Sequence, residues 1–174
     1  MDVMLLPGNG LRIKGKNASI VVNPTKETNK TEADSILVLN DDPNFSDAKI
    51  EGSRITIKGP GEFEVGGIKV SVTRVSEKLV ARVDVDFVKV LVGSGDAIEK
   101  IQDKVEGSDL LIVNSDAKFN YSILASLESK VLLVYGDLKE EVSKSVGKAG
   151  GEKTNKYSTT VDKLPTEPTY VLLG

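Results

Sequence analysis

Hydrophobic and polar residues alternate in short segments through the first half of the chain. Residues 54–58 and 67–72 alternate cleanly, and the turn sequence Gly-Pro-Gly at 59–61 separates them. A period of two is typical of strands with one exposed face. Further strand-like segments lie at residues 11–14, 18–22, 35–39, 79–84 and 87–92. This half therefore predicts a series of short strands, the first two of which form a hairpin.

After Gly95 the pattern changes to helices that alternate with buried strands. The segment 96–105 has apolar residues on one helical face, and Asp96 is a suitable N-cap residue. Helices are also predicted at 121–127 and 138–146, and strands at 110–113, 131–135 and 170–173. Residues 148–158 are rich in Gly, Lys and Thr and predict a mobile loop.

Antiparallel strands followed by alternating helices and strands favour two packed sheets with helices outside. The mid-strand residues predicted to form the core are Leu37, Val90, Leu111 and Leu132. The chain has 174 residues, of which 39% are hydrophobic and 28% charged, as expected for one globular domain over residues 1–174.

The charge and hydropathy of the chain argue against nucleic acids and membranes as binding partners. The net charge is −3, and no basic stripe is interleaved with aromatic residues, so we expect no nucleic-acid partner. No apolar run approaches the roughly 20 residues that span a bilayer, and the first residues do not resemble a signal peptide. We therefore expect a cytoplasmic protein that does not bind membranes.

The chain contains neither histidine nor cysteine. Imidazole and thiolate groups ligate most zinc sites, and they activate or provide the nucleophile in most nucleophilic hydrolases. The Gly-x-Ser-x-Gly motif of serine hydrolases is also missing from the sequence. The usual apparatus of these enzymes is therefore excluded.

Residues 40–47, Asn-Asp-Asp-Pro-Asn-Phe-Ser-Asp, form an acidic loop after a buried strand. Hard cations such as calcium and magnesium prefer carboxylate and amide oxygens. A cation held by Asp41, Asp42 and Asp47 would be one basis for metal-dependent hydrolysis. Phe45, however, occupies the position at which a calcium loop needs glycine. A solvated loop with Asx-turns is the favoured interpretation.

The segment Gly93-Ser94-Gly95-Asp96 joins a predicted strand to a predicted helix, and Asp116 ends the next strand about 20 residues later. This spacing outlines a dinucleotide-binding unit, in which a helix N-terminus receives a phosphate. Ile98 stands where the third glycine belongs, and the Asp96 carboxylate would repel a phosphate. A nucleotide or small-anion site at Gly93–Asp96 is therefore an alternative to an ordinary strand-to-helix turn.

Four segments match known family motifs in order. The most specific is Gly-Pro-Gly-Glu-Phe-Glu-Val-Gly-Gly at 59–67, and the others are 6–15, 33–39 and 161–165. Together they resemble the metallo-β-lactamase superfamily, specifically its small single-domain, uncharacterised zinc-dependent hydrolase branch, whose motif reads Gly-Pro-Gly-Glu-Tyr-Glu-Val-Gly-Gly. The resemblance spans the whole chain and implies an α/β fold, a four-layer αββα sandwich reduced in size.

The same resemblance implies where the metal site would lie. The family's His-x-His-x-Asp-His loop aligns with residues 40–45, its bridging Asp with Ser94, its last His with Gly136 and its early His with Gly8. The implied site positions are Gly8, Asn40, Asp42, Asn44, Phe45, Ser94 and Gly136. Amides and a phenyl ring cannot replace imidazole ligands, and without a metal no activated water forms.

We therefore expect a degenerate, non-catalytic protein of this fold with a binding or scaffold role. It would have no catalytic residues, no bound metal and no cofactor. Its partner would be an unknown protein or a small ligand, and a homo-oligomer is one such assembly. The alternatives are a hydrolase that uses a cation at Asp41, Asp42 and Asp47, and a nucleotide or anion binder at Gly93–Asp96.

Overall fold

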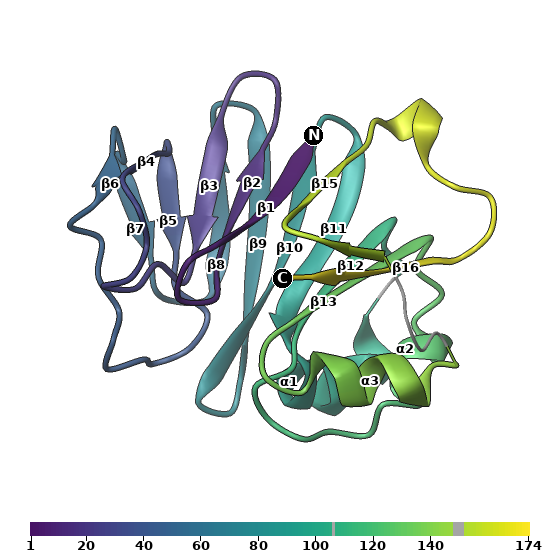
Figure 1. The fold of residues 1–174 in the computed structure, drawn as a ribbon. Helices are drawn as coiled ribbons and strands as arrows, with labels where there is room; N and C mark the ends of the chain where they lie inside the picture. The colour runs from purple at the N-terminus through teal and green to yellow at the C-terminus, as the bar shows by residue number, and fades with distance from the viewer. Residues whose placement is uncertain (106, 148–151) are drawn as a thin grey trace.

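Two sheets packed face to face make up most of the computed structural model, which describes residues 1–105, 107–147 and 152–174 (Figure 1). The first sheet has the strand order β15 (Lys156–Ser158), β1 (Asp2–Leu6), β2 (Gly10–Lys14), β3 (Ser19–Val22), β5 (Ser35–Leu37) and β7 (Ile55–Ile57). The second has the order β14 (Glu152–Thr154), β16 (Thr169–Leu173), β13 (Val131–Tyr135), β12 (Leu110–Asn114), β11 (Val88–Ser94), β10 (Lys78–Val85), β9 (Ile68–Val75) and β8 (Gly61–Val65).

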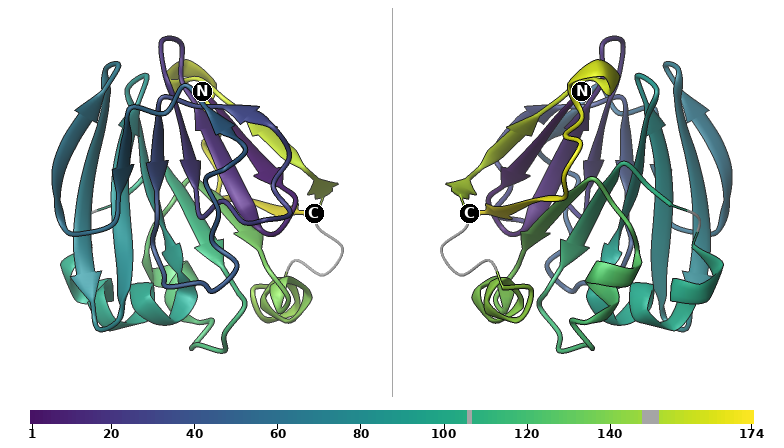
Figure 2. Two further views of the ribbon diagram at one scale, coloured as in Figure 1. Left: turned by 90° about the vertical axis from the view of Figure 1, so that its left-hand side faces the viewer. Right: turned by 90° about the vertical axis from the view of Figure 1, so that its right-hand side faces the viewer.

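The described helices are α1 (Gly95–Ile101), α2 (Ile123–Ser126) and α3 (Lys139–Ser145), with short 3-10 turns at Gln102–Lys104 and Val161–Lys163. They lie at one end of the sandwich, and the β2–β3 turn lies at the other (Figure 2). None of these helices is long and apolar enough to cross a membrane.

An aliphatic core fills the space between the sheets because alternating strand residues face inward from both of them. Leu37 and Val90 belong to this core and are fully buried. Leu111 and Leu132 lie on the other face of the second sheet, where they pack with helix residues such as Ile98. The four core positions predicted from the sequence are therefore confirmed.

The helices cover the second sheet, because α1, α2 and α3 each follow one of its parallel strands. Over the outer face of the first sheet the described chain places a short parallel pair, β4 (Thr31–Glu32) and β6 (Ile50–Glu51). Ala33 and Ile50 from this region pack against Leu6 and Val21. The mixed α/β sandwich is confirmed. Within the described residues it is smaller than the expected four-layer sandwich, because the helices cover one of its two sheets.

The expected mobile loop at 148–158 is wrong for its second half. Residues 148–151 lie outside the described residues, but 152–158 form β14 and β15. β14 pairs in parallel with β16, and β15 pairs antiparallel with β1, so this segment crosses from one sheet to the other. Tyr157 packs against the core while its strand neighbours are exposed, a pattern that short edge strands tolerate.

Candidate functional site

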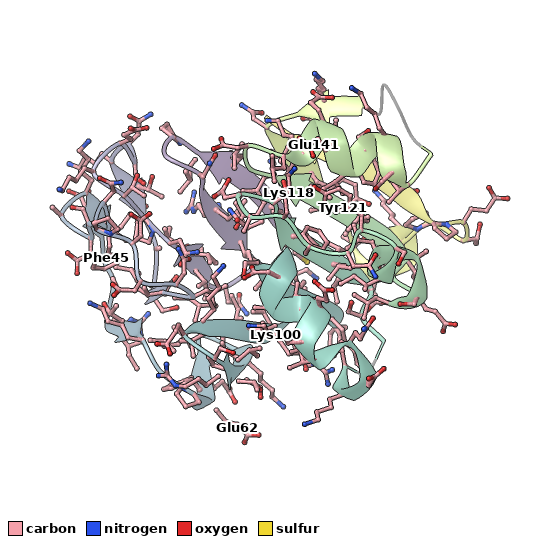
Figure 3. All side chains as sticks on the ribbon, turned by 90° about the horizontal axis from the view of Figure 1, so that it is seen from below. Phe45, Glu62, Lys100, Lys118, Tyr121 and Glu141 are labelled. Carbon is pink, nitrogen blue, oxygen red and sulfur yellow. The ribbon has the colours of Figure 1, made fainter. Side chains whose placement is uncertain are left out.

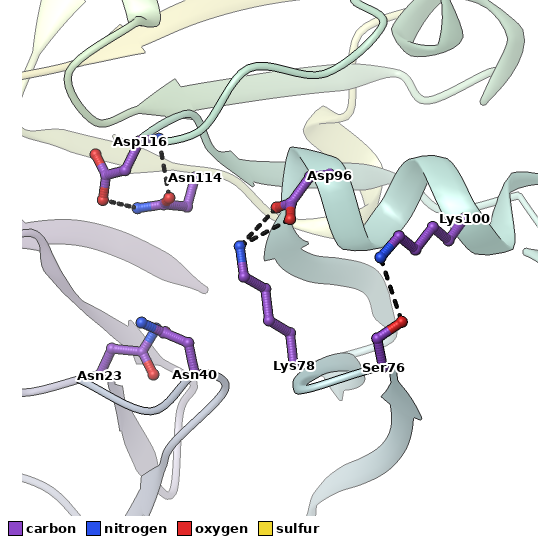
Figure 4. Close-up of polar contacts among 8 residues, drawn as sticks. All are labelled: Asn23, Asn40, Ser76, Lys78, Asp96, Lys100, Asn114 and Asp116. Atoms are coloured by element: carbon purple, nitrogen blue, oxygen red, sulfur yellow. Dashed lines mark hydrogen bonds and ion pairs between the residues drawn. The ribbon is translucent and has the colours of Figure 1, made fainter.

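The carboxyl ends of several strands meet at one edge of the sandwich. The parallel register of β11, β12 and β13 places Ser94, Asn114 and Tyr135 side by side. The first sheet joins this edge where Leu79 N donates a hydrogen bond of 2.7 Å to Leu39 O. Polar side chains from both sheets gather there (Figure 4). We call this group the polar edge: Asn23, Asn40, Lys78, Asp96, Asn114 and Asp116.

An ion pair occupies the centre of the polar edge. Lys78 Nζ lies 2.8 Å from both carboxylate oxygens of Asp96, and the two side chains are 33% and 29% exposed. Partial burial tends to raise the pKa of Asp96, but the Lys78 ammonium and the Ser94 hydroxyl outweigh it and hold that pKa below its ordinary value. Asp96 is therefore ionised at neutral pH and matched by a cation from the chain itself.

This pairing corrects one sequence prediction. Ser94, not Asp96, is the N-cap residue of α1, and it makes no side-chain capping hydrogen bond. The Asp96 side chain turns instead toward Lys78, which precedes it by 18 residues and belongs to β10. Local spacing predicted the helix but not this long-range partner of its first turn.

Asn40 forms an amide pair at the first-sheet side of the polar edge. Asn23 Nδ2 donates to Asn40 Oδ1 at 2.6 Å, and Leu39 N donates to Asn23 Oδ1 at 2.7 Å. These bonds tie the segment after β3 to the segment after β5. Asn23 has a φ of +47°, which asparagine adopts more readily than most residues. Asn40 thus holds the backbone in place of the ligand that the resemblance implied.

A second polar pair follows β12. Asn114 Nδ2 donates to Asp116 Oδ2 at 2.8 Å, and Asp137 N donates to Asp116 Oδ1 at 2.9 Å. Gly136 packs against the Asp116 carboxylate. Its φ is +104°, and a Cβ at this position would lie 2.5 Å from Asp116 Oδ1. A ligand side chain at position 136 would therefore displace Asp116.

Tyr135 forms the buried floor beside this pair. Burial raises the pKa of its hydroxyl, the nearby Asp116 carboxylate raises it further, and the Asn114 side chain opposes the shift only in part. The phenol therefore stays neutral throughout the physiological range. A group with so high a pKa is a poor general acid or base near pH 7.

Beyond Asn40, which belongs to the polar edge, the acidic loop bonds within itself. Asp42 Oδ1 accepts a hydrogen bond of 2.7 Å from Asn44 N, and Asp42 O accepts one of 2.9 Å from Phe45 N. This is the Asx-turn that the favoured interpretation predicted. Among residues 1–105, 107–147 and 152–174, no group of three or more Asp or Glu residues could hold a metal ion. Asp41, Asp42 and Asp47 therefore do not converge as a hard-cation site requires.

Three of the implied site positions gather instead around residues 25 and 26. Phe45 pairs with Thr25 through an isolated β-bridge, and Asn44 O accepts a hydrogen bond from Lys26 N. The Phe45 ring receives the Lys58 ammonium at 4.4 Å, and Phe45 lies on the opposite side of the view from Tyr121 and Glu141 (Figure 3). Gly8 has a φ of +78°, and a Cβ there would collide with the Thr25 hydroxyl.

The strand-to-helix turn at Gly93–Asp96 belongs to a parallel β11–α1–β12 unit, as its spacing predicted. A Cβ at Gly95 would overlap the ring of Phe119, so this glycine permits close packing of an aromatic side chain. Asp96 is already paired with Lys78. The turn is accounted for by these contacts, and none of them favours a phosphate.

Asn40, Ser94 and Gly136 are predicted from the sequence to lie in the site, whereas Asn23, Lys78 and Asn114 are not. The sequence pattern could have indicated Asn114 and Asn23. Asn114 is the last residue of a buried apolar run, and Asn23 follows another. Lys78 carries no local signal, because its role depends on Asp96 in the following strand-helix unit.

Comparison with known proteins identifies the architecture. No protein-family model and no curated protein matches the sequence. The structure is similar to that of a candidate Zn-dependent hydrolase of the metallo-β-lactamase superfamily from Thermotoga maritima, with a TM-score of 0.77 and 15% identity over 99% of this chain and 98% of that chain. It is also similar to a candidate metal-dependent hydrolase from Parabacteroides distasonis, with a TM-score of 0.57 and 17% identity over 83% of this chain and 89% of that one.

Zinc, which the first of these proteins is named for, does not fit the residues present here. Zinc sites are built from imidazole, thiolate and carboxylate groups, and this chain has no histidine or cysteine. The two carboxylates of the polar edge accept hydrogen bonds from the side chains of Lys78 and Asn114 and from the backbone N–H of Asp137. The likeness therefore concerns the backbone, and this chain has the metallo-β-lactamase fold.

Proposed function

We propose that this protein is a non-catalytic relative of the metallo-β-lactamase-fold hydrolases that acts by binding a protein partner or a small ligand. The observation that carries the proposal is the ion pair between Lys78 and Asp96. It engages the Asp96 carboxylate beside Ser94, a position to which the family resemblance assigned a metal ligand. A divalent cation would have to compete with the Lys78 ammonium for that carboxylate, which favours the metal-free state.

The hydrogen bonds around the ion pair support the same proposal. The two carboxylates of the polar edge, Asp96 and Asp116, already have partners that a metal would have to displace. Freeing Asp96 would leave the Lys78 ammonium partly buried without its counter-ion, which is unfavourable. Freeing Asp116 would leave Asp137 N without an acceptor.

Neither Asp96 nor Tyr135 is suited to acid–base chemistry without a metal. A general base works best when its pKa lies near the working pH. The pKa of Asp96 is held below its ordinary value, and the pKa of Tyr135 is raised. Both shifts move these groups away from neutrality, which favours binding over catalysis.

The test measures metal content and hydrolysis together. The full chain, purified from its own host without chelators, is examined by native mass spectrometry and elemental analysis. It is then assayed with lactam, thioester and phosphodiester substrates, with Lys78→Met and Asp96→Asn variants as controls. We expect no stoichiometric zinc and the same background rate in all three proteins. One zinc per chain, removed by a chelator with loss of hydrolysis, would contradict the proposal.

A further inference from the structure

Three hairpin turns meet at the end of the sandwich opposite the helices. Lys16 N donates to both carboxylate oxygens of Asp86, at 3.0 and 3.3 Å, which ties the β2–β3 turn to the β10–β11 turn. Gly66, in the β8–β9 turn, packs so closely on Ala18 that a Cβ there would lie 2.5 Å from the Ala18 Cβ. We call residues 15–18, 66–67 and 86–87 the turn cluster.

Phe87 is the unusual residue of this cluster. Its side chain is 90% exposed, and its φ is +68° after Asp86 with a φ of +50°. A bulky residue in this left-handed region is strained, and two-residue hairpin turns prefer glycine at the second position. The neighbouring turn follows that rule, because Gly66 and Gly67 have φ values of +57° and +87°. Phe87 thus carries both backbone strain and solvent exposure.

A hollow of about 390 Å³ lies beside Phe87. Gly66, Gly67 and Ile68 line one wall, and Asp86 and Phe87 line another. A Cβ at Gly67 would meet no atom within 4 Å, so this wall is open to an incoming side chain. The same small surface therefore presents an aromatic knob and a hollow next to it.

Acidic and basic side chains alternate from strand to strand beside the hollow. Glu64, Lys69, Asp84 and Lys89 lie opposite one another in register across β8, β9, β10 and β11. Acidic and basic groups thus alternate across the surface that adjoins Phe87. When two such surfaces meet about a two-fold axis, lysines of one can face aspartates of the other.

We propose that the turn cluster is the interface of a homodimer, in which Phe87 of each copy enters the hollow of the other. A two-fold interface requires a self-complementary surface, because residue i meets residue j and residue j meets residue i. Knob, hollow and alternating charges on one surface meet this requirement. The proposal rests on the turn cluster and the charged strand residues beside it, and it is independent of the function proposed for the polar edge.

The first experiment measures self-association of the full chain by sedimentation equilibrium. We expect a concentration-dependent dimer, and we expect Phe87→Gly to raise its dissociation constant by ~10-fold or more because it removes a central aromatic anchor. Glycine also suits the φ of this position, so the variant should fold. Ile55→Ser is the matched control, because this apolar side chain is exposed on β7, the edge strand of the first sheet, and does not belong to the turn cluster.

The second experiment uses the absence of cysteine from the natural sequence. Two single-cysteine variants that keep Phe87, Asn17→Cys and Lys69→Cys, are given different mass tags, mixed and oxidised. We expect the mixed disulfide pair to exceed that formed by Asn17→Cys with Lys100→Cys, since Lys100 lies in α1 at the other end of the sandwich (Figure 3). A monomer at every concentration, or a dimer that Phe87→Gly leaves intact, would overturn the proposal. So would Phe87-dependent binding of the monomer to phosphatidylserine vesicles.

Discussion

The two ends of this sandwich use their side chains in opposite ways. At the polar edge, Lys78, Asp96, Asn40 and their neighbours are bonded to one another. At the turn cluster, Phe87 extends into solvent from a strained backbone. The difference teaches that this edge of the fold can be ordered without imidazole ligands, because its polar side chains bond to one another. Exposure and strain then identify a different surface for interaction.

The polar edge and the turn cluster both depend on the packing of the two sheets. Truncating buried residues of that packing is expected to have the largest effect. Leu37→Ala in the first sheet and Leu132→Ala in the second should each reduce the free energy of unfolding by ~2–5 kcal/mol, because each deletes buried methyl groups and leaves a cavity. Urea denaturation would measure the loss. Two separate transitions in either variant would show that the sheets unfold independently.

Within the turn cluster, the packed glycine and the open glycine should respond differently. Gly66→Ala combines strain at positive φ with a collision against Ala18, and it should cost ~1–3 kcal/mol. Gly67→Ala is its matched control, because it has the strain but no neighbour within 4 Å. Thermal unfolding of both variants would measure the difference. Equal losses would mean that the contact with Ala18 does not hold the turns together.

At the polar edge, Lys78→Met should lower the free energy of unfolding by at most ~1 kcal/mol at pH 7, because the pair is partly exposed and screened. The folded-state pKa of Asp96 is lowered, so its stabilisation is present above about pH 4 and is lost as the pH falls through the folded value. The difference between variant and parent should therefore shrink in acid. Lys100→Met is the control, since Lys100 Nζ bonds to the uncharged Ser76 hydroxyl. A pH-independent difference would contradict the ion-pair account.

The smallest effect is expected at the acidic loop. Asn44→Ala should change stability by less than ~0.5 kcal/mol, because this exposed residue uses its backbone to bond Asp42 and Lys26. Millimolar magnesium, calcium or manganese should leave the thermal midpoint nearly unchanged at physiological salt. A saturable rise in the thermal midpoint that Asp42→Asn abolishes would instead support a hard-cation site at this loop.

The sequence predicted those features that depend on local pattern. The alternation at 67–72 and the apolar run at 131–135 correspond to β9 and β13, because burial of one or both faces dictates them. Residues 152–158 were misjudged because edge strands need few apolar residues, and their pairing partners lie at the two ends of the chain.

The candidate site divides in the same way. The resemblance located Asn40 and Gly136, whereas the bonds that define the polar edge join residues far apart in the sequence. Asp96 pairs with Lys78 across 18 residues, and Asp137 with Asp116 across 21. The predicted sandwich was confirmed, but the helical layer over the first sheet was expected from the family and is replaced by β4, β6 and their flanking segments in the described chain.

The segment that crosses between the sheets has a consequence for the order of assembly. β15 can form its ladder hydrogen bonds only when β1 is in place, and β14 only when β16, near the end of the chain, is in place. Asn155 joins the two strands, and its carbonyl accepts a hydrogen bond from Leu5 N. We therefore expect this segment to pair late in folding. Contacts that form after the transition state slow unfolding and leave the folding rate nearly unchanged, so the segment should make the folded sandwich slow to unfold.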